Sequence, residues 1–476
     1  MRRVGLVLAL LALVALPAMA QSEYMDYNIM GAGARAHGMG GAFIGLADDA
    51  TAVSWNPAGI AQLDKMEASA VGLFNIKGYI YKYQDSDGPY DTTFTEKHIA
   101  PNFFSLALPM KVGGRNLVLA AAYQRQIDMG TSSSGQFDRE SFIFDYYPSS
   151  SLYALGYLYS PSKYEDKVKG GVDAITPAVA LQLNPNIYIG VAANIFVNGT
   201  TDEYKNTFSP NLWDDIAIRD IYDANWNYLA TLKDTFDITG SESYNYETKY
   251  NGFGLNGGLL ATSRKFNFGA KIQLPFTLKQ KTTETYDIAY TWRWIGNPTN
   301  TRDTSSATTN KYEHTIKMPF SFGFGVAIKP TDNLTIAADF ERRPYGKTNV
   351  YNDYMLYNLW SDETNHLSDT LLLKNCNQFR VGLEYIFIGS NAVFPVRLGF
   401  RTDPKTYTGF YDDGTDTSQV AGKVFTAGFG MKFGNLWFDL AYELGMTSIM
   451  DYSTVYYEEN LSEKSHNVLA SCVVHF

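Results

Sequence analysis

The sequence predicts an all-β fold, a transmembrane antiparallel β-barrel of 14 strands with an N-terminal helical hatch inside its lumen. Three observations support this prediction. Segments of about 8–10 residues alternate between apolar and polar or small side chains, as the strands of membrane-spanning barrels do. The connections between these segments alternate between short and long. After residue 20, no run reaches the about 20 apolar residues that a membrane-spanning helix requires.

Residues 1–20 are predicted to be a secretory signal peptide. Two arginines precede the apolar run Val4–Leu16, and the sequence AMA at 18–20 matches a cleavage site. The apolar run is shorter than the about 20 residues that span a bilayer, which argues against a retained membrane anchor. No cysteine follows the cleavage site, so we expect no lipid anchor. The mature chain is therefore expected to begin at Gln21 and to be exported.

The composition excludes several classes of function. The formal net charge of −10 argues against a nucleic-acid partner. Neither G-x-S-x-G nor H-E-x-x-H occurs, so we expect no enzyme, no catalytic residues, no cofactor and no metal site. A Ser and a His that meet inside the barrel, as in an outer-membrane phospholipase, are the remaining enzymatic alternative. Cys376 and Cys472 match no metal or redox spacing, and whether they pair is left open.

The predicted strands are recognised by strict alternation. In Leu436–Leu444, five large apolar residues share one face, while Trp437, Asp439, Ala441 and Glu443 share the other. One face therefore suits lipid and the other a wetter interior. Fourteen such segments are expected at 67–82, 98–110, 115–129, 171–183, 186–203, 248–262, 265–285, 311–329, 333–349, 376–389, 393–405, 421–433, 435–450 and 462–476.

The connections define the topology of the barrel, which we place at residues 66–476. Short connections such as 111–115, 184–186, 329–333 and 389–391 contain Gly, Pro, Asn or Asp, the residues of tight turns. Long connections are expected to be external loops, at 83–97, 130–170, 204–247, 286–310, 350–375, 406–420 and 451–461. Six short turns and seven long loops are the number that 14 antiparallel strands require, and both termini then lie at the short-turn side.

Residues 21–65 lack strand alternation and are predicted to form the hatch. Gly31–Phe43 is rich in Gly and Ala, so its backbone can pack closely against the wall. Asp48 or Asp49 can cap a short helix over Ala50–Ser54. Asn56 can cap the next helix, which then begins with a proline. The compact shape favours a position inside the lumen, and an exposed N-terminal extension is the alternative.

The segment GMGGAFIGLADDATAVSWNPAGIAQL (38–63) resembles the N-terminal hatch of the long-chain fatty acid transporter family, the FadL/TodX-type outer-membrane proteins. Its Asn-Pro-Ala triplet at 56–58 matches the triplet of that hatch. Asn251–Pro275, Met318–Glu341 and Phe379–Tyr385 resemble strands of the family. Phe476 resembles the closing aromatic residue that the outer-membrane assembly machinery recognises. The resemblance spans almost the whole mature chain.

This resemblance implies a monomeric barrel in the outer membrane of a Gram-negative-type bacterium, with outer-membrane lipid around it. It implies passive, ligand-gated uptake of hydrophobic compounds such as long-chain fatty acids. Ligands would be captured at external loops, pass to an inner apolar pocket, and leave by a hatch shift and a gap beside a kinked third strand. No Gly or Pro occurs within Leu117–Met129 to kink that strand here. The alternatives are a docking protein of a secretion system, similar to the PorV type, and an open pore.

Three groups of site residues are predicted. The hatch group is Gly38, Gly40, Gly41, Asp48, Asp49, Asn56, Pro57 and Ala58. Candidate ligand-binding residues are Phe43 and Trp55, with Ile218, Tyr222, Leu229 and Leu232 on an expected amphipathic helix in the loop 204–247. That helix either catches ligands or packs over the barrel mouth. Inward-pointing charges that need partners are Asp339, Glu341, Arg380, Glu384, Arg397, Arg401, Asp439 and Glu443.

The inward charges are expected to form an ion-pair ladder that braces the hatch, and a proton or ion relay is the alternative. Two acidic segments, Asp85–Asp91 and Tyr411–Thr417, have the oxygens to hold Ca²⁺ but equally suit solvated external loops.

Overall fold

The computed structural model of the chain describes residues 26–85, 88–147, 152–208, 215–223, 225–294, 301–347, 349–358, 363–408, 419–453 and 458–476. The predicted signal peptide and the segment 411–417 lie outside these residues, as do two residues of the segment 85–91. Within the described chain, both cysteines are free thiols, and no three His, Cys, Asp or Glu side chains gather as metal ligands. In the same residues, no helix combines the length and the apolarity needed to cross a bilayer.

The wall of the molecule is a closed antiparallel barrel. Each wall strand pairs with the next, and the last pairs with the first. In the described part of the chain these 14 strands are β1 (Glu67–Asp85), β2 (Gly88–Val112), β3 (Arg115–Asp128), β5 (Leu152–Asn184), β6 (Ile187–Val197), β9 (Tyr228–Thr262), β10 (Phe266–Gln273), β13 (Ser321–Ile328), β14 (Leu334–Arg343), β17 (Cys376–Ile388), β18 (Val393–Thr408), β19 (Gln419–Phe433), β20 (Leu436–Ser453) and β21 (Glu458–His475). The predicted 14-stranded barrel is confirmed.

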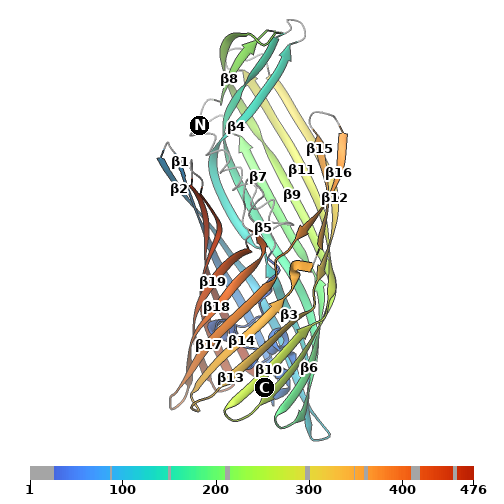
Figure 1. The fold of residues 1–476 in the computed structure, drawn as a ribbon, viewed down its shortest axis with the longest axis vertical. Coiled ribbons are helices and arrows are strands. Elements are labelled where there is room, and N and C mark those ends of the chain that lie inside the picture. The colour runs from blue at the N-terminus through green and yellow to red at the C-terminus, as the bar shows by residue number, and fades with distance from the viewer. Residues whose placement is uncertain are drawn as a thin grey trace.

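One side of the barrel continues far beyond the other (Figure 1). The additional strands in the described residues are β4 (Thr131–Tyr147), β7 (Gly199–Phe208), β8 (Asp215–Tyr222), β11 (Phe276–Trp294), β12 (Thr301–Met318), β15 (Asn349–Asn358) and β16 (Glu363–Leu372). Much of 130–170, 204–247, 286–310 and 350–375, the predicted external loops, is therefore strand that extends the wall. These segments contain many tyrosines, which favour strands, and their backbone groups bond to neighbouring strands instead of water.

Prolines divide two strands that the alternation predicted as continuous. The segment 265–285 is interrupted at Leu274–Pro275, and the segment 311–329 is interrupted at Pro319–Phe320. Proline has no N–H to donate to the ladder, so the pairing stops at these points. The predicted strand 333–349 ends early for the same reason, because Pro344 follows β14 and the chain continues as the short 3₁₀ helix η2 (Tyr345–Lys347).

The hatch consists of α2 (Ala34–Gly38), α3 (Ala52–Trp55) and the 3₁₀ helix η1 (Pro57–Gln62). Figure 1 shows it in dark blue inside the barrel, toward the short turns. Asn56 caps η1 as expected, because its Oδ1 accepts a hydrogen bond from the Ala58 amide at 3.2 Å. α3 starts at Ala52, two residues later than predicted, and the predicted cap by Asp48 or Asp49 is wrong, because its N-cap is Thr51 without a side-chain cap. The Asp49 carboxylate instead accepts from the Thr51 amide in the preceding turn.

The lumen at the level of the hatch is filled by small side chains of the wall. The apolar cluster there joins hatch residues such as Met39, Phe43 and Trp55 to inward-facing alanines of the wall, Ala107, Ala120, Ala122, Ala178, Ala180, Ala192, Ala327, Ala337 and Ala441. The wall therefore presents large residues to lipid and small residues to the hatch, and an exposed N-terminal extension is excluded. At one contact, Gly40 has a φ of 66° and lies directly against the backbone of Phe400, where a side chain has no space.

Candidate functional site

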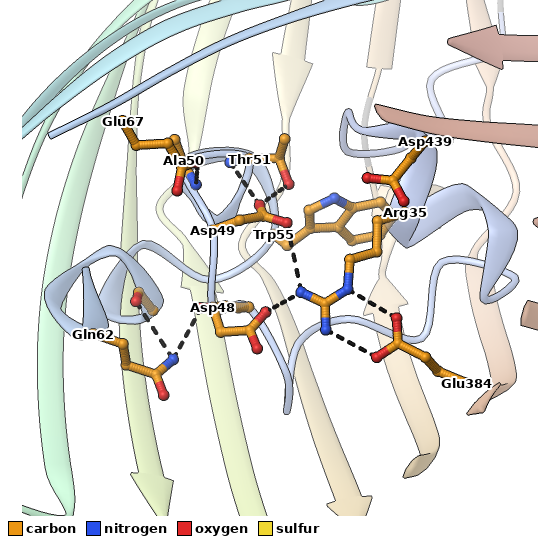
Figure 2. A network of polar contacts seen from close by, with 12 residues as sticks. Arg35, Asp48, Asp49, Ala50, Thr51, Trp55, Gln62, Glu67, Glu384 and Asp439 are labelled. Atoms are coloured by element: carbon orange, nitrogen blue, oxygen red, sulfur yellow. Dashed lines mark hydrogen bonds and ion pairs between the residues drawn. The ribbon is translucent and has the colours of Figure 1, made fainter. Parts of the chain in front are cut away.

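A chain of ion pairs joins the hatch to the wall. Arg35 of α2 contacts Asp48 at 2.5 Å and Glu384 of β17 at 3.0 Å (Figure 2). Glu384 also accepts from Arg397 Nε at 2.7 Å, and Arg397 Nη1 reaches Asp439 at 2.6 Å. Except for the half-buried Arg35 and Asp48, these side chains are almost fully buried. Buried charges of this kind are stable only when each has its partner, so the hatch position and the wall charges depend on one another.

His37 forms a second polar connection. Its Nδ1 lies 2.7 Å from Glu443 Oε1 and its Nε2 lies 2.8 Å from the carbonyl oxygen of Gly31. Both neighbours accept hydrogen bonds, so only the doubly protonated imidazolium satisfies both contacts. Glu443 also accepts two hydrogen bonds from Arg401 and one from Asn467.

A third connection involves two neighbouring carboxylates of β14. Asp339 Oδ2 accepts from the backbone amides of Phe43 and Ile44 at 2.7 and 2.8 Å. Glu341 lies within 2.8 Å of three cations, Lys271, Arg343 and Arg380. The first carboxylate thus fixes the hatch backbone, while the second balances a cluster of positive charge in the wall.

All eight inward charges listed from the sequence are buried, and each contacts a charged group or the hatch backbone. The residues that sequence reasoning missed are their partners, above all Arg35 and His37. A signal for them exists: Arg35 stands in the Gly- and Ala-rich segment Gly31–Phe43, where a cation needs a buried acid. Lys271 was missed because no charge of its strand was listed, and Arg343 was missed although it follows Glu341 by two residues on the same face of β14.

The opposite end of the hatch is held by Glu67 and Asn116. Glu67 Oε1 accepts from the Ala50 amide at 2.7 Å, as Figure 2 shows. Asn116 Nδ2 donates to the carbonyls of Ala61 and Leu63 at 2.8 and 2.6 Å. Burial first, and then the negative charge of nearby Glu67, raise the pKa of Asp49 to about 7 against the lowering effect of Arg35.

The hatch triplet at 56–58 bonds directly to the barrel wall. Asn56 Nδ2 donates to the carbonyl of Ile44 at 2.9 Å and to that of Leu259 in β9 at 3.0 Å. The other predicted hatch residues also lie at contacts. Gly38 O accepts from Thr426 Oγ1 at 3.0 Å, and Thr426 Oγ1 accepts from the Gly40 amide at 2.9 Å. Gly41 has a φ of 79° and packs beside Trp55.

Phe43 and Trp55, two predicted ligand residues, are buried in the hatch core. Their rings pack edge to face at 6.3 Å, and the Trp55 indole donates to the Ala32 carbonyl at 2.7 Å. Trp55 also borders a polar cavity of about 40 Å³ with Lys271 and Arg343 on its wall, room for only a few waters. A ligand reaches these two aromatic side chains only after the hatch moves.

A second apolar cluster lies on the side of the hatch away from the short turns. Along β6, Ala192 belongs to the hatch cluster and Phe196, farther from the turn at 184–186, belongs to the second. Its buried members are Tyr27, Val172, Ala174, Phe196, Tyr250, Phe276, Leu278, Ile316, Met318, Tyr345, Leu373 and Cys376. Sequence reasoning missed this cluster, which we call the apolar chamber, because its members lie far apart in the sequence, on several strands and on the segments between them.

The N-terminal segment Asp26–Met30 crosses the apolar chamber. Tyr345 Oη donates to the Tyr27 carbonyl at 2.7 Å, and Arg343 Nη2 donates to the Ile29 carbonyl at 2.6 Å. The Tyr27 amide donates to Thr406 Oγ1 at 3.2 Å. The Tyr27 side chain is thereby held, almost fully buried, among the residues of the apolar chamber.

The predicted external helix is wrong. Ile218 and Tyr222 lie in β8, Leu229 and Leu232 lie in β9, and the two strands form a hairpin. The helical spacing is broken at Asp223, whose side chain accepts from the Asn225 and Asn227 amides and forms a turn. The described tip of this hairpin exposes three large apolar side chains, Trp226, Tyr228 and Leu229, each more than half exposed.

The third strand has a different irregularity from the kink that the resemblance implied. The register between β3 and β5 shifts between Arg125 and Ile127, which marks a bulge. β3 pairs with β2 only up to Gln124, opposite Phe103, and in the described chain the outer half of β2 pairs with β1 alone. The ladder between these two neighbouring wall strands is therefore incomplete at the long-loop side.

The site and the barrel together define a class: a membrane-spanning β-barrel of 14 strands, closed by its own N-terminal hatch. No protein-family model and no curated protein matches the sequence. Solved structures with the same fold include a Pseudomonas aeruginosa FadL homologue, at 12% identity and a TM-score of 0.52 over 95% of this chain and 100% of that one.

Two further structures agree. The Pseudomonas putida toluene transporter TodX matches at 13% identity and a TM-score of 0.51, over 94% of this chain and 99% of that one. The CymD monoaromatic hydrocarbon channel matches at 13% identity and a TM-score of 0.50, over 94% and 98%. The resemblance to the FadL/TodX-type barrels is thus confirmed at the level of the fold.

Proposed function

We propose that the protein is an outer-membrane channel for passive, ligand-gated uptake of hydrophobic compounds, such as long-chain fatty acids. The observation that carries this proposal is the apolar chamber beyond the hatch, a buried cluster of aromatic and aliphatic side chains inside the barrel, separate from the cluster that packs around the hatch. Proteins with the same fold are titled toluene transporter and monoaromatic hydrocarbon channel, which supports the same class of substrate.

The proposed path has two stages. The exposed residues Trp226, Tyr228 and Leu229 collect apolar molecules at the far tip of the external strands. The molecule then displaces Tyr27 from the apolar chamber, which loosens Asp26–Met30 and, through Arg343, the hatch below it. We place the barrel in the outer membrane as a monomer, inserted by the outer-membrane assembly machinery after removal of residues 1–20.

Uptake into cells that lack their own channel for hydrophobic compounds tests the proposal. Expression of the full chain should accelerate the entry of a fluorescent long-chain fatty acid or of toluene several-fold. The matched control is Phe324→Ala, which removes an aromatic ring from the lipid-facing surface and should leave the rate of entry unchanged. Entry that is no faster than in cells without the barrel, for both compounds, would overturn the proposal.

A docking protein of a secretion system is the second candidate. The tall external extension made by strands such as β5, β9 and β11 favours it, because this surface stands well clear of the barrel (Figure 1). A secreted protein that co-purifies in stoichiometric amount, while uptake is absent, would favour docking over transport.

A further inference from the structure

A groove of about 460 Å³ lies in the lipid-facing surface of the barrel, over β5, β6, β9 and β10. Its walls are aliphatic, and each side chain is between 39 and 49% exposed on the outer surface: Val179, Ile189, Val191, Leu259 and Ile272. Lys271 also borders the groove, but its ammonium group turns inward to Glu341 at 2.8 Å. The groove therefore presents an apolar surface to the membrane.

The groove exists because one outward-facing row of the sheet contains a glycine, which has no side chain. Gly257 of β9 stands opposite Val191 of β6 and opposite Ile272 of β10, both large and outward-facing. In the next row, Leu259 stands between Ile189 and the small residue Ala270. The two small residues, Gly257 of β9 and Ala270 of β10, lie diagonally to one another, so the gap runs obliquely across these two strands and is not an isolated pit.

The inner face of the same strands carries the hatch. Gly190 and Gly258 face inward, and a Cβ atom at either position would collide with Asn56 or Pro57. The amide of Asn56 donates to the carbonyl of Leu259, whose side chain borders the groove outside. At this place only the backbone of one sheet separates the anchor of the hatch from the membrane.

We propose that this groove binds one acyl chain of a membrane phospholipid. Its volume falls in the range of small-molecule sites, about 300–1,000 Å³. Its lining is aliphatic, which suits a flexible hydrocarbon chain, and its edges continue into the lipid-facing surface on both sides. Inside a bilayer there is no hydrophobic gain from this contact, so retention rests on dispersion contacts along the chain. The expected enrichment over ordinary surrounding lipid is therefore several-fold and not many orders of magnitude.

Photo-crosslinking in liposomes tests the proposal on the full mature chain. The probe is phosphatidylcholine with a diazirine in one acyl chain, and the crosslinked residues are mapped by mass spectrometry. We expect several-fold more crosslinks at the groove than at the outward surface around Ala427 of β19. Gly257→Leu fills the groove and should reduce its crosslinking to that background, whereas Ala427→Leu, at another outward position, should leave groove crosslinking unchanged.

Val191→Ala widens the groove and provides a second variant that should fold and retain or raise the crosslinking. Even crosslinking around the barrel, or a groove signal that survives Gly257→Leu in a correctly folded barrel, would show surrounding lipid only and overturn the proposal. Folding is checked by the shift in electrophoretic mobility on heating. The measurement involves no transported ligand, so its outcome is independent of the proposed uptake.

Discussion

Arg35 in the hatch and Glu384 in β17 form a two-pronged ion pair, with Nη2 and Nε at 3.0 and 3.1 Å from the two carboxylate oxygens (Figure 2). Glu384 is also the partner of Arg397, so one carboxylate balances a cation of the hatch and a cation of the wall. Both cations are largely buried. The negative charge of Glu384 is therefore stabilised by two partners only while the hatch is in place.

Neutralising this carboxylate should release the hatch. After Glu384→Gln, Arg35 still pairs with Asp48 and Arg397 still pairs with Asp439. The free energy that holds the hatch in the barrel should therefore fall by about 3 kcal/mol, the low end of the range for a broken buried ion pair. Hydrogen exchange of the hatch amides should therefore quicken by about 100-fold. Glu247→Gln, which breaks an exposed pair with Lys249, is the control and should change exchange by less than about threefold. Equal protection in both variants would contradict this role.

The hatch should become less stable as the pH rises. The pKa of Asp49 is raised from 3.8 to about 7 in the folded protein, so the native state binds this proton more tightly than the unfolded chain. Stability therefore falls between pH 4 and 7, by at most about 1.4 kcal/mol per pH unit for one group, and levels off above. Hydrogen exchange of the α3 amides, corrected for the intrinsic pH dependence of exchange, measures this loss of stability.

Asp49→Asn isolates this contribution. The amide oxygen can still accept from the Thr51 amide, but it carries no charge beside Glu67 and Asp48. The variant should lose most of the slope between pH 4 and 7 and be more stable than the original chain at pH 8. A slope of opposite sign, or an unchanged slope in the variant, would be inconsistent with the raised pKa.

Removing the hatch should turn the closed barrel into a conducting one. Deletion of 21–65 leaves the inward alanines and the charged residues of the wall exposed to water across the lumen. Single-channel recordings should show a nearly silent full-length barrel and a large steady conductance after the deletion. If the truncated barrel inserts and conducts no more than the complete one, the hatch does not close the lumen.

The wall could be predicted from the sequence because its signal is local. In β17, Arg380 and Glu384 alternate with Phe379, Val381 and Leu383, and the structure places the two groups on opposite faces. The ion pair between Arg35 and Glu384 joins residues 349 positions apart, and no periodicity in a single sequence specifies such a partner. Alternation alone does not mark the strand breaks, which lie at Pro275 and Pro319.

The external strands escaped prediction for a different reason. In β11, for example, residues 276–285 lie within a predicted strand, but Gln280, Thr282 and Glu284 then interrupt the row of apolar residues on one face, and 286–294 was expected to be a loop. Their pairing is held by backbone hydrogen bonds and by rows of tyrosines, for example Tyr244 stacked on Tyr286 at 4.5 Å across β9 and β11. Periodicity of hydrophobicity, the main signal in sequence analysis, is weak in such strands.

Shortening the aromatic side chains of the apolar chamber should weaken ligand binding. Phe196 and Phe276 stack with ring centroids 5.1 Å apart and an angle of 13°, and both are at least nine-tenths buried. A bound hydrocarbon that covers part of one ring loses about 1–1.5 kcal/mol of apolar contact when that ring is removed, or about tenfold in Kd. Phe276→Ala should show this loss in titrations with a fluorescent fatty acid.

Phe324→Ala removes a ring of the same size from the lipid-facing surface, where Phe324 is 46% exposed, and should leave Kd unchanged. Equal effects of the two substitutions would place the ligand outside the chamber.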